Sequence, residues 1–167
     1  MSMNAILDVC YGNAMAVVAC VQFRDWTDSQ ASAVNISEVE IQADYVPGRF
    51  FERELPCLLH AIERVSVSFE VIVIDGYVHL KPPHVKGLGF HLAETVSYPV
   101  AVIGVAKSPL KVADQFVPVF RGRSRRPLFV SAIQLPTERA AALIESMSGP
   151  FRVPTLIKMA DRLCRGG

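Results

Sequence analysis

Three acidic residues stand in apolar surroundings, where an ionised side chain is costly. Asp8 lies inside the apolar run 5–11, Asp75 ends the apolar run 71–74, and Glu54 lies among the apolar residues of 50–56. A carboxylate in such a setting needs a compensating cation. Three of them, on separate segments that could converge, predict a bound divalent cation and hydrolytic chemistry.

Each carboxylate also has a simpler explanation when it is taken alone. Glu54 could pair with a buried arginine or cap a helix, Asp75 could belong to an Asp-Gly turn, and Asp8 could face outward from a half-exposed strand. On a helix over 49–65, however, a step of about 100° per residue places Glu54 within the apolar arc. Asp75 ends a predicted buried strand, where ligands bind in open α/β sheets. Their joint occurrence favours one shared site.

Basic residues supply two further candidates. Lys107 follows the apolar run 100–105, so its amine could reach the same sheet edge and stabilise phosphate charge; the alternative is a solvated lysine at a strand end. The arginine-rich run 121–126 predicts an exposed loop or a hairpin tip. Its side chains could contact a nucleic-acid backbone or simply be solvated.

The apolar pattern predicts an α/β fold in which an antiparallel hairpin feeds a partly parallel sheet flanked by helices. Gly12-Asn13 between two apolar runs is a strong hairpin signal. Buried parallel strands account for the β-branched runs. The predicted strands are 5–11, 14–23, 34–41, 67–75, 100–105 and 128–131, and the predicted helices are 49–65, 87–96, 137–147 and 156–165.

Composition sets the class of protein. The chain has 167 residues, 51% of them hydrophobic and 20% charged, which predicts one globular domain over 1–167. The net charge of +1 does not by itself indicate nucleic acid. We find no targeting or membrane segment, so we expect a cytoplasmic protein. Cys10, Cys20, Cys57 and Cys164 lack metal-ligand spacing and are expected to be buried reduced thiols.

Seven motifs, in one order along nearly the whole chain, resemble the endonuclease V family of deoxyinosine 3′-endonucleases. The matching segments are DVCY at 8–11, YVPGRFFERELP at 45–56, VIVIDG at 71–76, GLGFHL at 87–92, IGVAKS at 103–108, PLFVS at 127–131, and RVP with KMADRL at 152–154 and 158–163. The resemblance is to a shortened and partly divergent member, and it implies a ribonuclease H-like mixed sheet.

The resemblance also implies roles for individual residues. Asp8, Glu54 and Asp75 match the metal-site carboxylates of the family, and Lys107 matches its active-site lysine. The positions expected to contact nucleic acid are Tyr45, Val46 and Pro47 (the wedge beside an extruded base), Gly48, Gly76 and His91, to which the arginine run adds Arg121 and Arg123.

One loop departs from the family pattern. Val78 replaces a second glycine after Asp75-Gly76, and no histidine stands in the family's place. His79, Lys81 and His84 are the alternatives for that role.

The resulting hypothesis is a Mg²⁺-dependent endonuclease, with Mn²⁺ as an alternative ion, that acts on DNA or RNA containing inosine-type bases and cuts 3′ to the lesion. We expect a monomer or a weak homodimer without membrane contact. Two other functions stay open. One is a nucleic-acid-binding module of this family that has lost catalysis, and the other is a phosphoesterase that acts on a small nucleotide.

Overall fold

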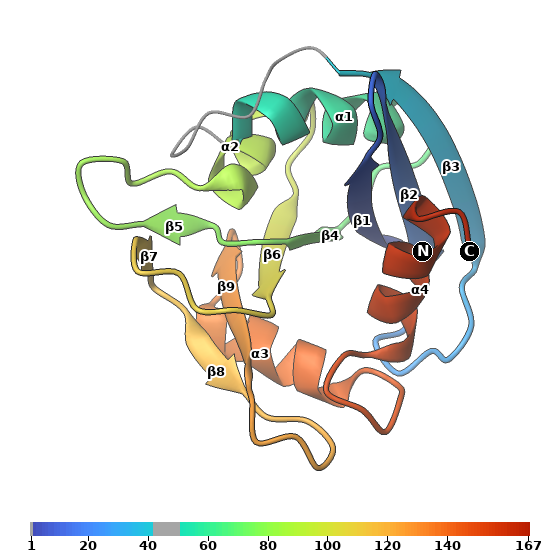
Figure 1. The fold of residues 1–167 in the computed structure, drawn as a ribbon. Helices are drawn as coiled ribbons and strands as arrows, with labels where there is room; N and C mark the ends of the chain where they lie inside the picture. The colour runs from blue at the N-terminus through green and yellow to red at the C-terminus, as the bar shows by residue number, and fades with distance from the viewer. Residues whose placement is uncertain (1, 42–50) are drawn as a thin grey trace.

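The computed structural model of this chain describes residues 2–41 and 51–167. Its centre is a seven-stranded sheet in the order β3-β2-β1-β4-β6-β9-β8 (Figure 1). The first three strands form an antiparallel meander of β1 (Asn4–Tyr11), β2 (Met15–Phe23) and β3 (Ala33–Glu40). The Gly12 amide donates to the Met15 carbonyl at 2.8 Å and closes the first turn, as the Gly12-Asn13 pair predicts.

The second half of the sheet is mixed. Strand β4 (Val71–Asp75) pairs in parallel with β1 on one side and with β6 (Ala101–Ala106) on the other. Strand β9 (Leu128–Ile133) runs antiparallel to β6, and β8 (Val117–Val119) pairs with β9 at the edge. Two further strands, β5 (His79–Leu80) and β7 (Ala113–Asp114), form a separate two-stranded ladder. The β-branched residues of β4 and β6 are buried, as expected for central parallel strands.

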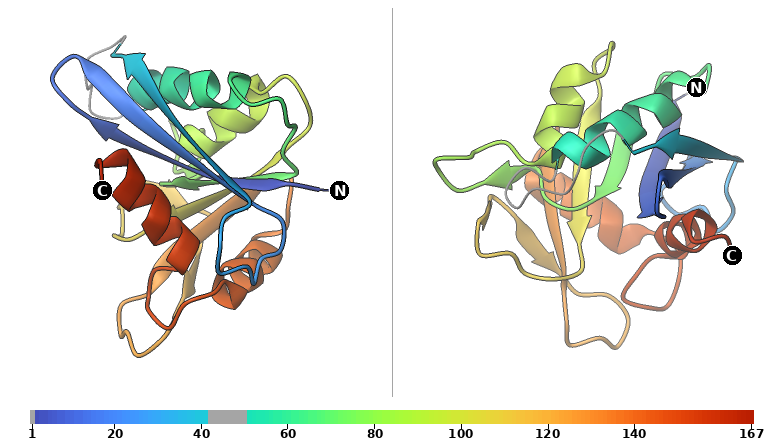
Figure 2. Two further views of the ribbon diagram at one scale, coloured as in Figure 1. Left: turned by 90° about the vertical axis from the view of Figure 1, so that its right-hand side faces the viewer. Right: turned by 45° about the horizontal axis from the view of Figure 1, so that its top comes forward.

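Helices cover both faces of the large sheet (Figure 2). The helices α1 (Phe51–Glu63) and α2 (Leu88–Thr95) lie on one face, over a core that includes Leu7, Ile72 and Ile74. On the other face, α3 (Thr137–Ser146) and α4 (Thr155–Cys164) cover a core that includes Ile6, Val73 and Val105. Consecutive strand residues point to opposite faces, so the two cores take alternate residues of the same strands.

The predicted elements are present, with ends that shift by a few residues. The largest difference is β4, which begins at Val71 and not at residue 67. The predicted start of α1 at residue 49 lies outside the described residues. The pattern missed β5, β7 and β8, which have two or three residues each and are too short to show a periodicity. In the described part of the chain, no helix combines the length and the apolar character needed to cross a bilayer.

Candidate metal centre

The sheet register brings Asp8 and Asp75 together. Parallel pairing matches Leu7 with Ile74, so each aspartate comes one residue later on neighbouring strands, at the same level. Such strands lie about 4.8 Å apart. Ile6 and Val73, two residues earlier, both belong to the core beneath α3 and α4. Since residues i and i+2 share a face, both carboxylates lie on the α4 side of the sheet, at the carboxyl ends of their strands.

Lys107 belongs to the same sheet edge. Asp75 pairs with Val105 on β6, and Lys107 comes two residues after Val105, on the same face. Lys107, Asp8 and Asp75 line one cavity of about 20 Å³ between the strand ends and α4, enough for one water-sized group. Burial raises the pKa of both carboxyls, and the positive charge of Lys107 partly opposes that shift.

The backbone beside Asp75 is shaped by two glycines. Gly76 has φ of +125°, a conformation that L side chains rarely adopt, and its amide donates to the Val105 carbonyl at 3.3 Å. A β-carbon at Gly104 would lie 2.5 Å from the Gly76 carbonyl oxygen. The chain can therefore turn away directly after the carboxylate while it stays packed against β6.

Glu54 reaches the site from the opposite layer. It lies on α1, only 6% of its surface is exposed, and its Oε2 is buried without a hydrogen-bond partner among the described residues. Burial, with smaller effects of Asp75 and Asp8, raises the pKa of Glu54 to about 8. Arg53 opposes this shift, but its guanidinium carbon lies 3.8 Å from the centre of the Tyr11 ring. Its Nε, like the Oε2 of Glu54, has no hydrogen-bond partner in the part of the chain that the structure describes. The arginine therefore leaves Glu54 incompletely compensated.

A fourth carboxylate, Asp161, was not among the predicted site residues. It lies on α4 and raises the pKa values of both Asp8 and Asp75, so it shares their surroundings. Its Oδ1 accepts a hydrogen bond from Arg165 Nε at 3.0 Å. The available signal was its place directly after Ala160, on the border of the buried face of α4, within the motif KMADRL.

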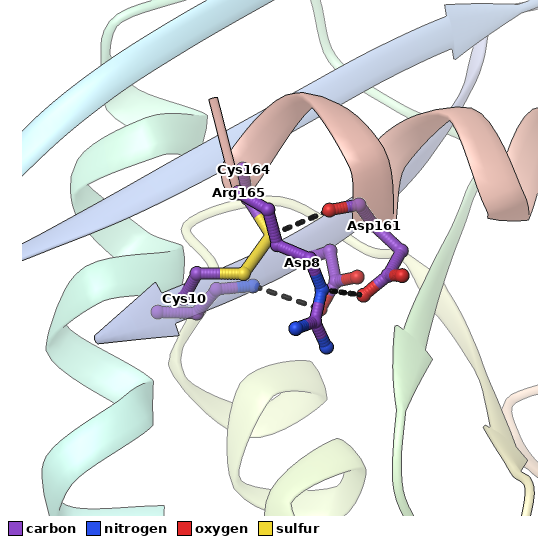
Figure 3. The surroundings of a disulfide bond; sticks show 6 residues. Asp8, Cys10, Asp161, Cys164 and Arg165 are labelled. Atoms are coloured by element: carbon purple, nitrogen blue, oxygen red, sulfur yellow. Dashed lines mark hydrogen bonds and ion pairs between the residues drawn. A yellow bond between two sulfur atoms is a disulfide. The ribbon is translucent and has the colours of Figure 1, made fainter. Parts of the chain in front are cut away.

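The expectation of four reduced thiols is wrong for two of them. Cys10 and Cys164 form a disulfide with a Cα–Cα distance of 5.5 Å, while Cys20 and Cys57 are free and buried. Cys10 follows Asp8 by two residues on β1, and Cys164 follows Asp161 by three residues on α4, so the disulfide joins the two elements next to their carboxylates (Figure 3). Sulfur atoms of both cysteines and a carboxylate oxygen of Asp161 lie within 4.8 Å of one another.

The donor set fits a hard divalent cation. Burial raises the pKa of Asp8 to about 6, and the negative charges of Asp75 and Asp161 add to this shift. Carboxylate oxygens are the ligands that Mg²⁺ and Ca²⁺ prefer. The buried Oε2 of Glu54, which has no hydrogen-bond partner among the described residues, supplies a further carboxylate oxygen. Asp8, Glu54, Asp75 and Asp161 therefore supply the donor type that such a cation needs, with Lys107 beside Asp8 and Asp75. Among the described residues, however, no three of these four carboxylates have oxygens within 4.8 Å of one another.

The predicted nucleic-acid contacts are only partly described. Tyr45, Val46, Pro47 and Gly48 lie outside the described residues. His91 stacks on Phe51, with ring centroids 3.8 Å apart, at the start of the helix that carries Glu54. Burial lowers the pKa of His91. The imidazole therefore contacts the helix that carries Glu54, on the α1–α2 side of the sheet.

The two predicted arginine contacts differ. The run 121–126 is the tip of the β8–β9 hairpin, as predicted, and Arg123 is exposed there. Arg121, in contrast, is 6% exposed. Its guanidinium donates to the carbonyls of five residues, namely Glu145, Met147, Gly149, Phe151 and Arg152. Arg121 is therefore placed to hold the chain between α3 and α4, and of the two arginines only Arg123 faces solvent.

The divergent loop after Asp75 is firmly packed. Val78 is fully buried, and its amide donates to Ser131 Oγ at 3.0 Å. One ring nitrogen of His79 lies 3.1 Å from the Ala132 carbonyl oxygen. Lys81 and His84 are exposed. The valine thus fills space inside the fold, where the family pattern has a glycine.

Comparisons with known proteins show which family this chain resembles. The family model described as Endonuclease V matches residues 2–119. Endonuclease V of Streptomyces avermitilis is 31% identical over 182 aligned residues, which cover 95% of this chain and 77% of the relative. Endonuclease V of Nocardia farcinica is 30% identical over an alignment that covers 95% of this chain and 78% of that relative.

Solved structures show the same fold. The Streptomyces avermitilis Endonuclease V structure has a TM-score of 0.79 and 26% identity, over 99% of this chain and 80% of that chain. Ciona intestinalis Endonuclease V, solved with a 24mer DNA containing an inosine followed by a ribo-adenosine, has a TM-score of 0.81 and 20% identity, over 99% and 84% of the two chains. These likenesses confirm the predicted ribonuclease H-like fold.

Proposed function

Because this chain belongs to the endonuclease V family, we propose that it is a metal-dependent endonuclease that hydrolyses the backbone of inosine-containing nucleic acid 3′ to the lesion. It would act as one domain over residues 1–167. The observation that supports the proposal is that Asp8 and Asp75 line one cavity with Lys107, while Glu54 is buried near enough for both aspartates to raise its pKa. The DNA bound by the Ciona intestinalis relative supports the inosine preference.

The residues divide the chemistry among them. Asp8 and Asp75 would hold Mg²⁺ or Mn²⁺, with Asp161 completing the acidic surroundings and Glu54 positioning a second ion or the attacking water. A bound divalent cation supplies Lewis acidity to the phosphate and hydroxide near neutral pH. Lys107 donates to a phosphate oxygen and offsets the charge that develops there. His91, Gly76 and the 45–48 segment are proposed to contact the nucleic acid around the extruded base.

Replacement of one central carboxylate tests the assignment. Asp75→Asn keeps the size of the side chain but removes a charged ligand, so we expect Mg²⁺-dependent nicking of an inosine oligonucleotide to fall by at least a hundredfold. The assay follows a labelled strand in DNA and in RNA, maps the cut ends, and includes Mn²⁺. Asp25→Asn, at an exposed aspartate, is the matched control. Nicking by a folded Asp75→Asn variant at the parent's rate contradicts the proposal.

The buried Val78 favours one alternative function, a nucleic-acid-binding module of this family that has lost catalysis. A side chain in the place of a glycine limits how closely a base can approach the backbone of this loop. If the chain has this function, it will bind the inosine oligonucleotides but will not nick them with Mg²⁺ or with Mn²⁺. The end-mapping assay, combined with a binding measurement on the parent protein, separates this alternative from the nuclease.

A further inference from the structure

A large hollow opens beside the metal centre, on the side of the hairpin tip. It has a volume of about 800 Å³, within the range of roughly 300–1,000 Å³ found for ligand pockets. We call it the basic hollow. It is lined by Lys107, Arg123, Ser124, Pro150, Phe151, Arg152, Val153, Lys158 and Asp161. Because Lys107 and Asp161 also belong to the metal centre, the hollow begins where the scissile phosphate would lie.

The charges of the basic hollow suit a polyanion. Four of its lining residues are cationic and only Asp161 is acidic. Arg152 is held at the wall, since its guanidinium donates to the carbonyls of Lys107 and Pro127. Arg123 and Lys158 are exposed, on the hairpin tip and on α4 respectively. Both side chains line the same hollow, so both are available to phosphates of a strand that enters it.

An exposed aromatic ring stands at the same place. Phe151 is 65% exposed, the highest value among the large apolar residues that the structure describes. The Lys158 ammonium lies 5.5 Å from its ring centroid. The carbonyl of Phe151, like those of Met147 and Gly149, accepts a hydrogen bond from the buried Arg121. The ring is therefore presented to solvent by a segment whose backbone is fixed.

A fixed aromatic ring between exposed cations is the arrangement by which proteins bind single strands, because any unpaired base can stack on it. We propose that the basic hollow binds an unpaired stretch of nucleic acid adjoining the scissile phosphate, with a base on Phe151 and phosphates on Arg123 and Lys158. The proposal rests on the proposed function for the position of the scissile phosphate. It adds that the strand beside the cut is bound unpaired.

Binding without turnover tests this site. Fluorescent oligonucleotides carrying one inosine, either single-stranded or fully paired, are titrated with the parent protein in EDTA. We expect tighter binding of the single strand, and Phe151→Ala should weaken it by roughly five- to a hundredfold, as for loss of one stacked base. Phe151→Trp should restore it. The matched control is Phe120→Ala, because Phe120 is 56% exposed but does not line the hollow.

The cations have a separate readout. Arg123→Ala and Lys158→Ala should each reduce the slope of log K against log salt concentration by about 0.7, the loss of one single-strand phosphate contact. Arg139→Ala, at an exposed arginine on α3, should leave the slope unchanged. Unchanged single-strand affinity in Phe151→Ala, or equal parental affinity for paired and unpaired strands, overturns the proposal. If the parent cuts inosine strands and these variants bind normally, only the proposal for the basic hollow is refuted. If the parent never cuts and these variants bind more weakly, only the proposed nuclease activity is refuted.

Discussion

Glu54 should destabilise the metal-free protein as the pH rises. Its folded pKa of about 8 lies above the ordinary value of 4.5, because the carboxyl is buried near Asp75 and Asp8. Between these values the folded chain keeps a proton that the unfolded chain releases. The free energy of unfolding therefore falls with increasing pH, by about 1.4 kcal/mol per unit. By pH 7 the loss is on the order of 3 kcal/mol, a large part of the stability of a typical domain.

Glu54→Gln removes this dependence while it keeps the shape of the side chain. The amide is neutral throughout, so we expect the variant and the parent to have similar stability near pH 4.5 and the variant to be more stable by about 3 kcal/mol at pH 7. Asp8, whose pKa is raised to about 6, adds a further fall between about pH 4 and pH 6 in both proteins, and Asp75, whose pKa burial also raises, acts in the same direction. The measurement is urea unfolding in EDTA at pH 4.5, 6 and 7.5.

Divalent metal should reduce the stability advantage of Glu54→Gln over the parent. A ligand that binds only the folded state stabilises it by about 2.7 kcal/mol at a hundred times its dissociation constant. We therefore expect Mg²⁺ at pH 7.5 to stabilise the parent more than Glu54→Gln. Glu63→Gln, at the exposed end of the same helix, is the control and should follow the parent. Parallel pH profiles for parent and Glu54→Gln would show that Glu54 is ionised without cost, and the electrostatic account of the site would then be wrong.

Two other features make separate predictions. Arg121→Met should lower the free energy of unfolding by about 3 kcal/mol or more, because it leaves buried carbonyls unpaired. The control Arg123→Met should change it by less than about 0.5 kcal/mol. Urea unfolding at pH 7 measures both, and equal effects would contradict the structural role of Arg121. Thiol titration of the unreduced, denatured chain should find two thiols, Cys20 and Cys57, and reduction should expose four. Cys164→Ser should cost about 2–5 kcal/mol, and four thiols before reduction would exclude the disulfide.

The sequence was sufficient to predict the longer helices and strands and to single out three of the four carboxylates, because their signals are local. Asp8 and Asp75 interrupt or end apolar strands, and Glu54 interrupts an apolar helix face. The pairing of Leu7 with Ile74, which sets the two aspartates side by side, joins segments far apart along the chain, and only the family resemblance pointed to it. Asp161 escaped detection because it borders the buried face of an otherwise ordinary amphipathic helix.

Long-range partners explain the remaining differences. Arg121 sits in a run of arginines that predicts solvation, yet five carbonyls from a segment some 30 residues later surround its guanidinium. No local pattern encodes that arrangement. The Cys10–Cys164 disulfide likewise joins residues separated by 154 positions, so spacing could not reveal it. In both cases the interacting groups are far apart in the chain, and only the three-dimensional fold shows that they meet.

These two features also lie where electrostatic repulsion opposes folding. Asp161 raises the pKa values of Asp8 and Asp75, so without a cation the charges on α4 and on the sheet repel each other. The disulfide fastens the end of α4 to β1 beside these charges, and Arg121 fixes the chain that leads into the helix. The same contacts that hold α4 against this repulsion also present Phe151 and Lys158 at the basic hollow. Weakening either anchor should therefore reduce metal affinity and strand binding together, whereas Phe151→Ala should affect strand binding alone.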